Sequence, residues 1–207
     1  MKEGLFITLE GVEGAGKTTL VDFIENLLVK SGHDVVKTRE PGGTKIGEQI
    51  REILLKNENN ELTDDTELLL IFAARAQHIK EVIIPSLSSG KIVLCDRFTD
   101  ASYAYQGGGR GIDESRINLL EKWVQSDLRP DLTILFDLDV TLGLERTKKR
   151  SKSDRFEEEK IVFFEKVRST YLKRAENEAK RFRIVNAELP IEKVKEELTI
   201  ILEEFIC

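Results

Sequence analysis

The segment Gly11-Val12-Glu13-Gly14-Ala15-Gly16-Lys17-Thr18 constrains the fold of this chain more than any other feature. It matches G-x-x-x-x-G-K-[ST], the phosphate-binding P-loop. The apolar run Leu5–Leu9 before it is typical of a strand, and apolar residues recur at helical spacing over Lys17–Lys30 after it. Because strand, glycine turn and helix are the context that a P-loop requires, we expect the chain to bind a nucleoside triphosphate.

Each part of this loop has a physical role. The glycines allow positive φ angles and a close approach of the backbone to an anion. Backbone N–H groups and the helix N-terminus supply donors, Lys17 adds a charge near the β and γ phosphates, and the Thr18 hydroxyl can bind Mg²⁺. The predicted triphosphate-binding residues are Gly11, Val12, Glu13, Gly14, Ala15, Gly16, Lys17, Thr18 and Thr19.

Strand and helix patterns alternate along the whole chain. Apolar runs suited to buried strands lie at Leu5–Leu9, Val35–Lys37, Ile92–Cys95, Leu132–Phe136 and Ile184–Val185. Amphipathic stretches suited to helices lie at Lys17–Lys30, Lys45–Lys56, Thr66–Ser88, Asp113–Ser126, Thr141–Arg150, Ile161–Lys180 and Ile191–Phe205. This alternation predicts one three-layer α/β domain over residues 1–207, with a central parallel sheet of about five strands flanked by helices.

Composition narrows the classes of partner. The formal charge of −6 argues against wholesale binding of nucleic acid. Cys95 and Cys207 show no metal or redox spacing, which fits a reducing, cytoplasmic environment. No apolar segment has the length of a membrane span or the pattern of a signal peptide, so we expect no contact with a membrane.

Charged residues that follow the predicted strands indicate a second, anionic ligand. Ligands of parallel α/β sheets collect at the carboxyl ends of the strands. Arg39 follows the second strand, and Asp96 and Arg97 follow the third, where an arginine can grip a phosphate with two hydrogen bonds. Phe72 and Arg75 lie one helical turn apart and suit a planar base attached to an anion. Phe72 could equally be plain core, and Arg75 could pair with a carboxylate of its own helix.

Several motifs together resemble one known family. The P-loop GVEGAGKT, TREPGGT (Thr38–Thr44), FAARAQ (Phe72–Gln77), DRFTDASYAYQGGGRG (Asp96–Gly111), RPDLT (Arg129–Thr133) and DRFE (Asp154–Glu157) occur in this order over nearly the whole chain. This pattern is similar to that of the bacterial thymidylate kinases, which are P-loop nucleoside monophosphate kinases.

The resemblance implies a reaction and a set of site residues. It implies transfer of the γ-phosphoryl group of ATP to dTMP, giving dTDP and ADP for dTTP biosynthesis, with Mg²⁺ bound by Thr18 and Asp96. It also implies a homodimer, formed through helices such as Thr66–Ser88. The implied catalytic residues are Lys17, Arg97, Arg150, Arg155 and Glu13. The implied dTMP-binding residues are Glu13, Arg39, Pro41, Phe72, Arg75, Arg97, Ser102, Tyr105 and Gln106.

The basic segment at about residues 146–158 is expected to form a mobile lid. The pattern alone favours a solvated charged segment. The P-loop supplies no arginine to the transition state, however, and in the family lid arginines close over ATP. Arg150 and Arg155 are the candidates, and an arginine of this kind contributes ~10³–10⁵ in rate.

One departure from the family concerns the base. Many members place an aromatic residue four positions before the arginine, where this chain has Ile71, whereas Phe72 lies three before Arg75. Three rival functions stay open at this point. They are a kinase acting on another nucleoside monophosphate, an ATP-binding or ATPase module without an acceptor, and a nucleic-acid-binding protein. The arginines at the strand ends argue against the second of these, and the acidic charge against the third.

Overall fold

A computed structural model describes residues 4–59, 61–148 and 154–206 of the chain. Within these ranges, five strands form one sheet in the order β2-β3-β1-β4-β5, and all neighbouring strands are parallel. The strands are β1 (Phe6–Glu10), β2 (Val35–Arg39), β3 (Ile92–Asp96), β4 (Leu132–Asp137) and β5 (Phe182–Asn186). The predicted five-stranded parallel sheet is therefore confirmed.

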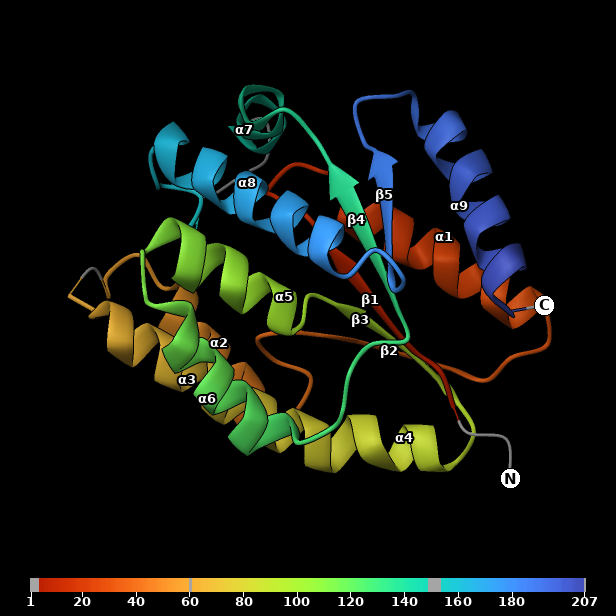
Figure 1. Ribbon diagram of the computed structural model, residues 1–207, viewed down its shortest axis with the longest axis horizontal. Coiled ribbons are helices and arrows are strands. Elements are labelled where there is room, and N and C mark those ends of the chain that lie inside the picture. The colour runs from red at the N-terminus through yellow and green to blue at the C-terminus, as the bar shows by residue number, and fades with distance from the viewer. Residues whose placement is uncertain (1–3, 60, 149–153, 207) are drawn as a thin grey trace.

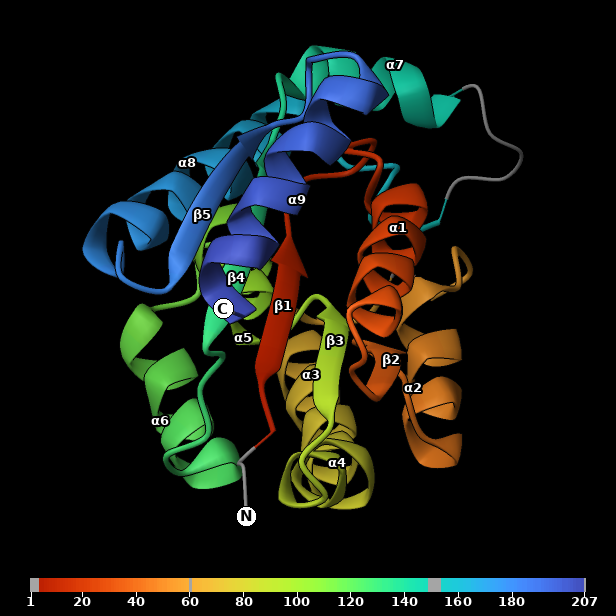
Figure 2. The ribbon, with the colours of Figure 1, turned by 90° about the vertical axis from the view of Figure 1, so that its right-hand side faces the viewer.

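Helices cover both faces of this sheet (Figure 1). They are α1 (Lys17–Lys30), α2 (Lys45–Leu55), α3 (Asp64–His78), η1 (Ile79–Ile83), α4 (Ile84–Ser88), α5 (Thr99–Ser102), η2 (Tyr103–Gly109), α6 (Glu114–Gln125), α7 (Val140–Lys148), α8 (Ile161–Asn177) and α9 (Ile191–Ile206). Helices α1 and α9 pack together on one face, and α8 and the α3–α4 helices lie on the other. Figure 2 shows α7 above the carboxyl end of β1.

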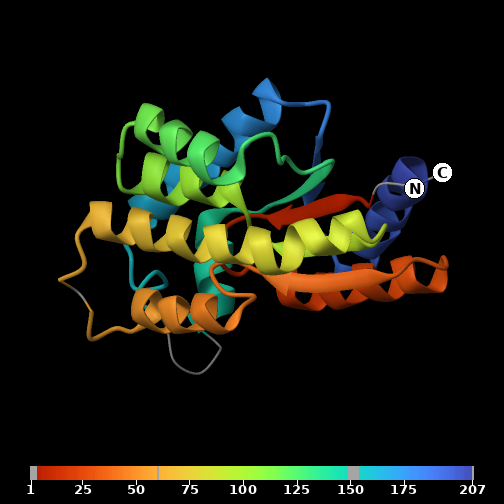
Figure 3. The same cartoon turned by 90° about the horizontal axis from the view of Figure 1, so that it is seen from below.

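The predicted helix Thr66–Ser88 appears as one long rod made of α3, η1 and α4 (Figure 3). Its middle segment, η1, is π-helical. Pro85 lies in the first turn of α4 and has no N–H to donate, so the backbone ahead of it cannot keep every i→i−4 hydrogen bond. The prediction of a single helix here is confirmed, with this local change of winding.

The sequence patterns missed the helical segment formed by α5 and η2. Its run Gly107-Gly108-Gly109 has low helix propensity, which hid the helix from a periodicity argument. Packing supplies the reason for the glycines. A Cβ on Gly108 would lie 3.0 Å from the carbonyl oxygen of Lys166, and one on Gly109 would lie 2.4 Å from the Phe163 ring. The glycines therefore allow η2 to pack directly on α8.

The core lies on both faces of the three central strands. All five residues of β1 are buried, and β3 and β4 are buried up to their last residue. Helix α1 contributes Leu20, Ile24 and Leu28, whose i, i+4 spacing places them on one buried face. None of the helices in the described ranges is long and apolar enough to cross a lipid bilayer.

The strand register brings polar residues from separate motifs to one edge of the sheet. Asp96 on β3 pairs with Leu9 on β1 and with Arg39 on β2. Glu10, which is the last residue of β1, continues directly into the P-loop. The predicted site residues that follow the strands therefore lie along a common edge.

Candidate active site

The P-loop joins β1 to α1, and its glycines have the positive φ angles that the sequence predicted. Gly11, Gly14 and Gly16 have φ angles of 141°, 75° and 81°. A Cβ at Gly14 would lie 2.2 Å from the carbonyl oxygen of Gly143 in α7, so only glycine fits there. No side chain caps the N-terminus of α1, which leaves its first N–H groups available to an anion.

Lys17 folds back over this loop. Its Nζ donates hydrogen bonds to the carbonyl oxygens of Gly11 at 2.8 Å and Val12 at 3.0 Å. Burial, together with the charge of Arg97, lowers the pKa of Lys17 to about 8, although Glu13 and Asp96 oppose the shift. An arriving phosphate would supply the counter-charge that this ammonium group needs.

A cavity of about 220 Å³ opens beside the P-loop. It gathers most of the predicted site residues from five separate segments of the chain. Those that line it are Glu13, Gly14, Ala15, Gly16, Lys17, Thr18, Arg39, Pro41, Arg75, Asp96, Arg97, Ser102, Tyr105 and Gln106. Gly11, Val12 and Thr19 belong to the loop or to the start of α1 without lining this cavity, and Arg150 lies outside the described residues.

Arg97 connects the P-loop with the cavity. Its backbone is in the left-handed region, with φ of 69°, and its Nη2 donates to Glu13 Oε1 at 2.5 Å and to the Tyr105 hydroxyl at 2.9 Å. Burial alone would raise the pKa of Glu13, but the charges of Arg97 and Lys17 and the hydrogen bonds outweigh burial and lower it to about 2. The carboxylate is therefore ionised and holds the guanidinium in place.

Two further arginines, Arg39 and Arg51, line the same cavity. Arg39 is half exposed, and its Nη2 donates to Glu48 at 2.8 Å. Arg51 on α2 donates to the Pro41 carbonyl at 2.9 Å, and burial and the charges of Arg39 and Arg97 lower its pKa. Arg51 was not among the predicted site residues, because an arginine within an amphipathic helix gives no signal that it faces a cavity.

Four buried polar atoms along this cavity lack hydrogen-bond partners within the described part of the chain. They are Arg75 Nη1, Asp96 Oδ1, Arg97 Nε and Ser102 Oγ. Each unpaired buried polar group costs roughly 1–3 kcal/mol, so such groups rarely gather without a reason. The two donors, the carboxylate oxygen and the hydroxyl are therefore available to a polar ligand.

Arg75 is oriented by Glu40 and Phe98, neither of which was among the predicted site residues. Its Nε donates to Glu40 Oε2 at 2.7 Å, and its Nη2 donates to the Phe98 carbonyl at 3.1 Å. Glu40 also contacts His78 Nδ1 at 2.9 Å. Only Nη1 is left, so this arginine is oriented before any ligand arrives.

Phe72 requires a correction. It is buried under the Arg75 guanidinium, at 4.6 Å from its ring centre, and packs with Leu68 and Tyr103 instead of lining the cavity. Ile71 lines the cavity in its place. One residue along a helix turns the side chain by roughly 100°, which directs Phe72 into the core. The plain-core reading of Phe72 is therefore right.

The prediction for Arg155 is also changed; of the two candidate lid arginines, it is the one that lies within the described residues. Arg155 is buried, and its Nη2 donates to Glu67 Oε2 of α3 at 2.5 Å while its Nε donates to the Leu54 carbonyl at 2.9 Å. The neighbouring Phe156 lines the cavity and meets the Tyr105 ring edge-on. Arg155 thus ties the end of the lid segment to α2 and α3 and does not line the P-loop cavity.

A second hollow lies on the far side of the loop and was not foreseen. Ala15, Gly16 and Leu20 form one wall, and Arg146 and the segment Ala187–Ile191 form the other. Arg146 Nη1 donates to the Ala187 carbonyl at 3.0 Å, which fixes the guanidinium at its rim. The P-loop therefore lies between two hollows.

The residues predicted to bind Mg²⁺ fit an ion shared with phosphates. Thr18 is the second residue of α1 and lines the cavity, and Asp96, whose Oδ1 is unpaired, lines the same cavity. No cluster of three metal-binding side chains occurs within the described residues. Mg²⁺ commonly uses one or two protein oxygens together with substrate phosphates and water, and this donor set agrees with that habit.

A sheet, a P-loop and a cation-lined acceptor cavity in this arrangement define a P-loop phosphotransferase. A family profile described as "Thymidylate kinase" matches residues 9–198. The thymidylate kinase of Pseudomonas savastanoi pv. phaseolicola is 55% identical over 98% of this chain and 97% of its own length, and that of Vesicomyosocius okutanii is 52% identical over 98% and 99%. The crystal structure of thymidylate kinase from Ehrlichia chaffeensis superposes with a TM-score of 0.79 at 35% identity, covering 97% of this chain and 99% of that one.

The chain belongs to the thymidylate kinase family. It is accordingly a nucleoside monophosphate kinase, as the sequence resemblance predicted.

The pKa of Lys17 gives the site a testable dependence on pH. We expect kcat/KM for ATP to fall above pH 8 and to be about tenfold lower at pH 9 than on its plateau, because only the protonated amine neutralises phosphate. Lys17→Arg, which stays charged, should lose this alkaline limb. A wild-type kcat/KM for ATP that stays constant up to pH 9 would refute the role of protonated Lys17 in neutralising phosphate.

The position of Arg155 generates a prediction about stability. Arg155→Ala should lower the free energy of unfolding by about 3 kcal/mol in urea titrations, because it removes a partner of the buried Glu67 carboxylate. Lys193→Ala is the control, since it breaks the exposed Lys193–Glu196 pair of α9 and should change stability by less than about 1 kcal/mol. Equal effects of the two variants would contradict a structural role of Arg155.

Proposed function

We propose that this enzyme transfers the γ-phosphoryl group of ATP to the 5′-phosphate of dTMP, giving dTDP and ADP. The observation that carries the proposal is the place of Arg97, whose guanidinium reaches both the P-loop carbonyl of Gly11 and the wall of the neighbouring cavity. A cation in this position contacts a donor phosphate and an acceptor phosphate at once.

The chemistry needs no general base. A phosphate monoester has a second pKa near 6, so its attacking oxygen is already anionic at neutral pH. The enzyme must instead hold two polyanions end to end and neutralise the charge that builds up during transfer. Lys17, Arg39, Arg51 and Arg97 supply positive charge around this point.

The residues of the cavity divide among the parts of dTMP. Arg97 and Arg39 would hold the 5′-phosphate, with Arg51 as a third cation. Glu13 would accept a hydrogen bond from the sugar 3′-hydroxyl, and Tyr105, whose hydroxyl contacts Glu13 at 3.1 Å, would crowd the 2′ position. Pro41 and Ile71 would contact the thymine ring. The polar edge of the thymine ring would contact Arg75, Ser102 and Gln106.

Mg²⁺ would be held by Thr18, Asp96 and the phosphates, and it would supply charge neutralisation at the transferred group. The triphosphate would lie along the P-loop, and the second hollow beside Arg146 would take the base of ATP. Arg150 stays the candidate for a lid arginine, while the role of Arg155 is to anchor the lid to α3.

The cytoplasmic location and the lack of a nucleic-acid partner stay predictions from composition. Other nucleoside monophosphate kinases remain the nearest rival, and a direct comparison of acceptors decides between them.

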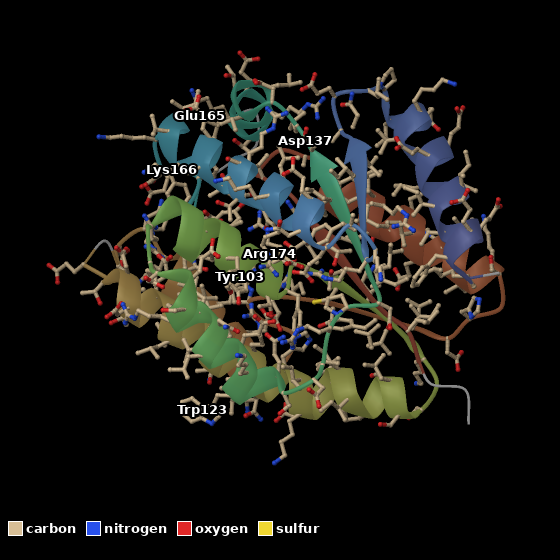
Figure 4. The ribbon with its side chains drawn as sticks, viewed as in Figure 1. Tyr103, Trp123, Asp137, Glu165, Lys166 and Arg174 are labelled. Carbon is tan, nitrogen blue, oxygen red and sulfur yellow. The ribbon has the colours of Figure 1, made fainter. Side chains whose placement is uncertain are left out.

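We also propose that the protein forms a homodimer through α3 and α6. These helices are joined by the Asp65–Arg116 pair, and one turn further along them lie the exposed Leu69 and Leu119. Trp123, one turn beyond Leu119, is 79% exposed and lies at the periphery of the protein in Figure 4. Large apolar side chains exposed together favour an interface.

Trp123→Glu should therefore convert the dimer to a monomer in light-scattering measurements. Ile200→Glu is the control, because Ile200 is an exposed apolar residue of α9, away from this surface. A Trp123→Glu protein that keeps the mass of the wild type would place the interface elsewhere.

An assay of ADP release with a panel of acceptors tests the reaction itself. We expect ADP release to require dTMP, with kcat/KM for dCMP and dGMP at least ~100-fold lower, because the cavity presents fixed hydrogen-bonding groups. ADP release that does not depend on an acceptor would support the ATPase reading. A preference for dCMP or dGMP would support the rival kinase reading.

A further inference from the structure

Glu67 of α3 is a buried carboxylate that the mechanism above does not use. It is only 1% exposed and lies where α3 faces η2 and the end of the lid segment. Two guanidinium groups hold it. Arg155 Nη2 lies 2.5 Å from Glu67 Oε2, and Arg110 contacts both oxygens, with Nη2 3.2 Å from Oε2 and Nε 3.3 Å from Oε1. Two guanidinium groups thus balance the negative charge of this buried carboxylate.

The other oxygen of Glu67 contacts a residue of the acceptor cavity. Gln106 Nε2 donates to Glu67 Oε1 at 2.8 Å. Gln106 is 98% buried, lines the cavity, and makes no second side-chain hydrogen bond to a described residue. One half of its amide is thus fixed, and the other half is free for a ligand.

The charge of Glu67 determines which end of the Gln106 amide faces the cavity. An ionised carboxylate has only acceptor oxygens, whereas a glutamine amide has one donating end and one accepting end. Gln106 must therefore turn its NH₂ group toward Glu67, since the opposite rotamer would bring two oxygens together. Its carbonyl Oε1 is left as a hydrogen-bond acceptor for the cavity.

This polarity fits one class of pyrimidine. Thymine and uracil present an N3–H donor next to the O4 acceptor, whereas cytosine presents an N3 acceptor next to an N4 amino donor. An acceptor at Gln106 Oε1 matches the N3–H group, and the unpaired donor Arg75 Nη1 matches O4. Cytosine would oppose acceptor to acceptor and donor to donor, leaving buried polar groups unpaired.

We propose that Glu67 is a specificity-determining positioning residue: it fixes the amide of Gln106 so that the cavity accepts pyrimidines with an N3–H group and rejects cytosine. The proposal rests on the proposed phosphorylation of dTMP and adds the origin of its base selectivity. Glu67 does not touch the acceptor and acts through Gln106.

Glu67→Gln tests this role, because a second amide can present either of its ends to Gln106. We expect the ratio of kcat/KM for dTMP to that for dCMP to fall by about tenfold or more. The ratio of dTMP to dUMP should stay unchanged, because both bases carry N3–H and O4. A purely structural loss would lower all three values together and leave both ratios at their wild-type values, which would overturn the proposal.

Two further variants show whether Glu67 acts through Gln106. Glu159→Gln weakens the ion cluster through Arg110 and leaves every contact of Glu67 itself in place, so the ratio of dTMP to dCMP should persist. In a Gln106→Leu background, Glu67→Gln should no longer change that ratio. A full additional loss in the double variant would show that Glu67 acts by another route.

If Glu67→Gln does not fold, Glu67→Asp provides the test. It keeps the charge, but its side chain is one methylene shorter, so the carboxylate lies farther from Gln106. The same fall in the ratio is expected, and an unchanged ratio would count against the proposal. A wild-type enzyme that fails to phosphorylate dTMP would instead refute the proposed function, so the two failures are distinguishable.

Discussion

Two polyanions must meet in this site, and the contact of Arg97 with Glu13 is the interaction on which that meeting depends. The guanidinium lies at the junction of the P-loop and the cavity, and Glu13 holds it there although Glu13 itself belongs to the P-loop. The loop thus contains the counter-charge that orients this guanidinium. In the proposed mechanism, this one ion pair couples the donor subsite to the acceptor subsite.

This arrangement requires an unusual backbone, and a buried carboxylate supports it. Arg97 adopts a left-handed φ that is uncommon for a residue with a Cβ. Glu10 Oε1 accepts the Phe98 N–H at 2.8 Å, and Glu10 Oε2 accepts the Tyr171 hydroxyl at 2.7 Å. Burial and the charge of Asp100 raise the pKa of Glu10 to about 8. The turn that aims Arg97 is thus held from inside the core by a strand residue and by a helix distant in sequence.

Much of this architecture could be predicted because it depends on local patterns. The P-loop, the alternation of strands and helices and the arginines at the strand ends are visible within short windows of sequence. The orientation of Phe72 could not be predicted in this way. Whether its side chain faces the core or the cavity depends on how α3 is rotated against η2. Arg155 was misplaced for a related reason. A basic segment looks solvated until the buried Glu67, 88 residues earlier in the chain, is brought next to it.

Carboxylates behind the cations give the site a further property. Arg39 is paired with Glu48, Arg75 with Glu40 and Arg97 with Glu13 before any ligand binds. A phosphate that enters therefore shares or replaces partners that already exist, and the net gain in electrostatic free energy is smaller than isolated arginines would give. The same pairing fits a chain of net charge −6, because the cavity lining combines its lysine and arginine side chains with an equal number of carboxylates. The carboxylates fix the direction of each guanidinium before a ligand binds. Little binding free energy is therefore lost to reorganising these side chains, and more of it is available to align two phosphates.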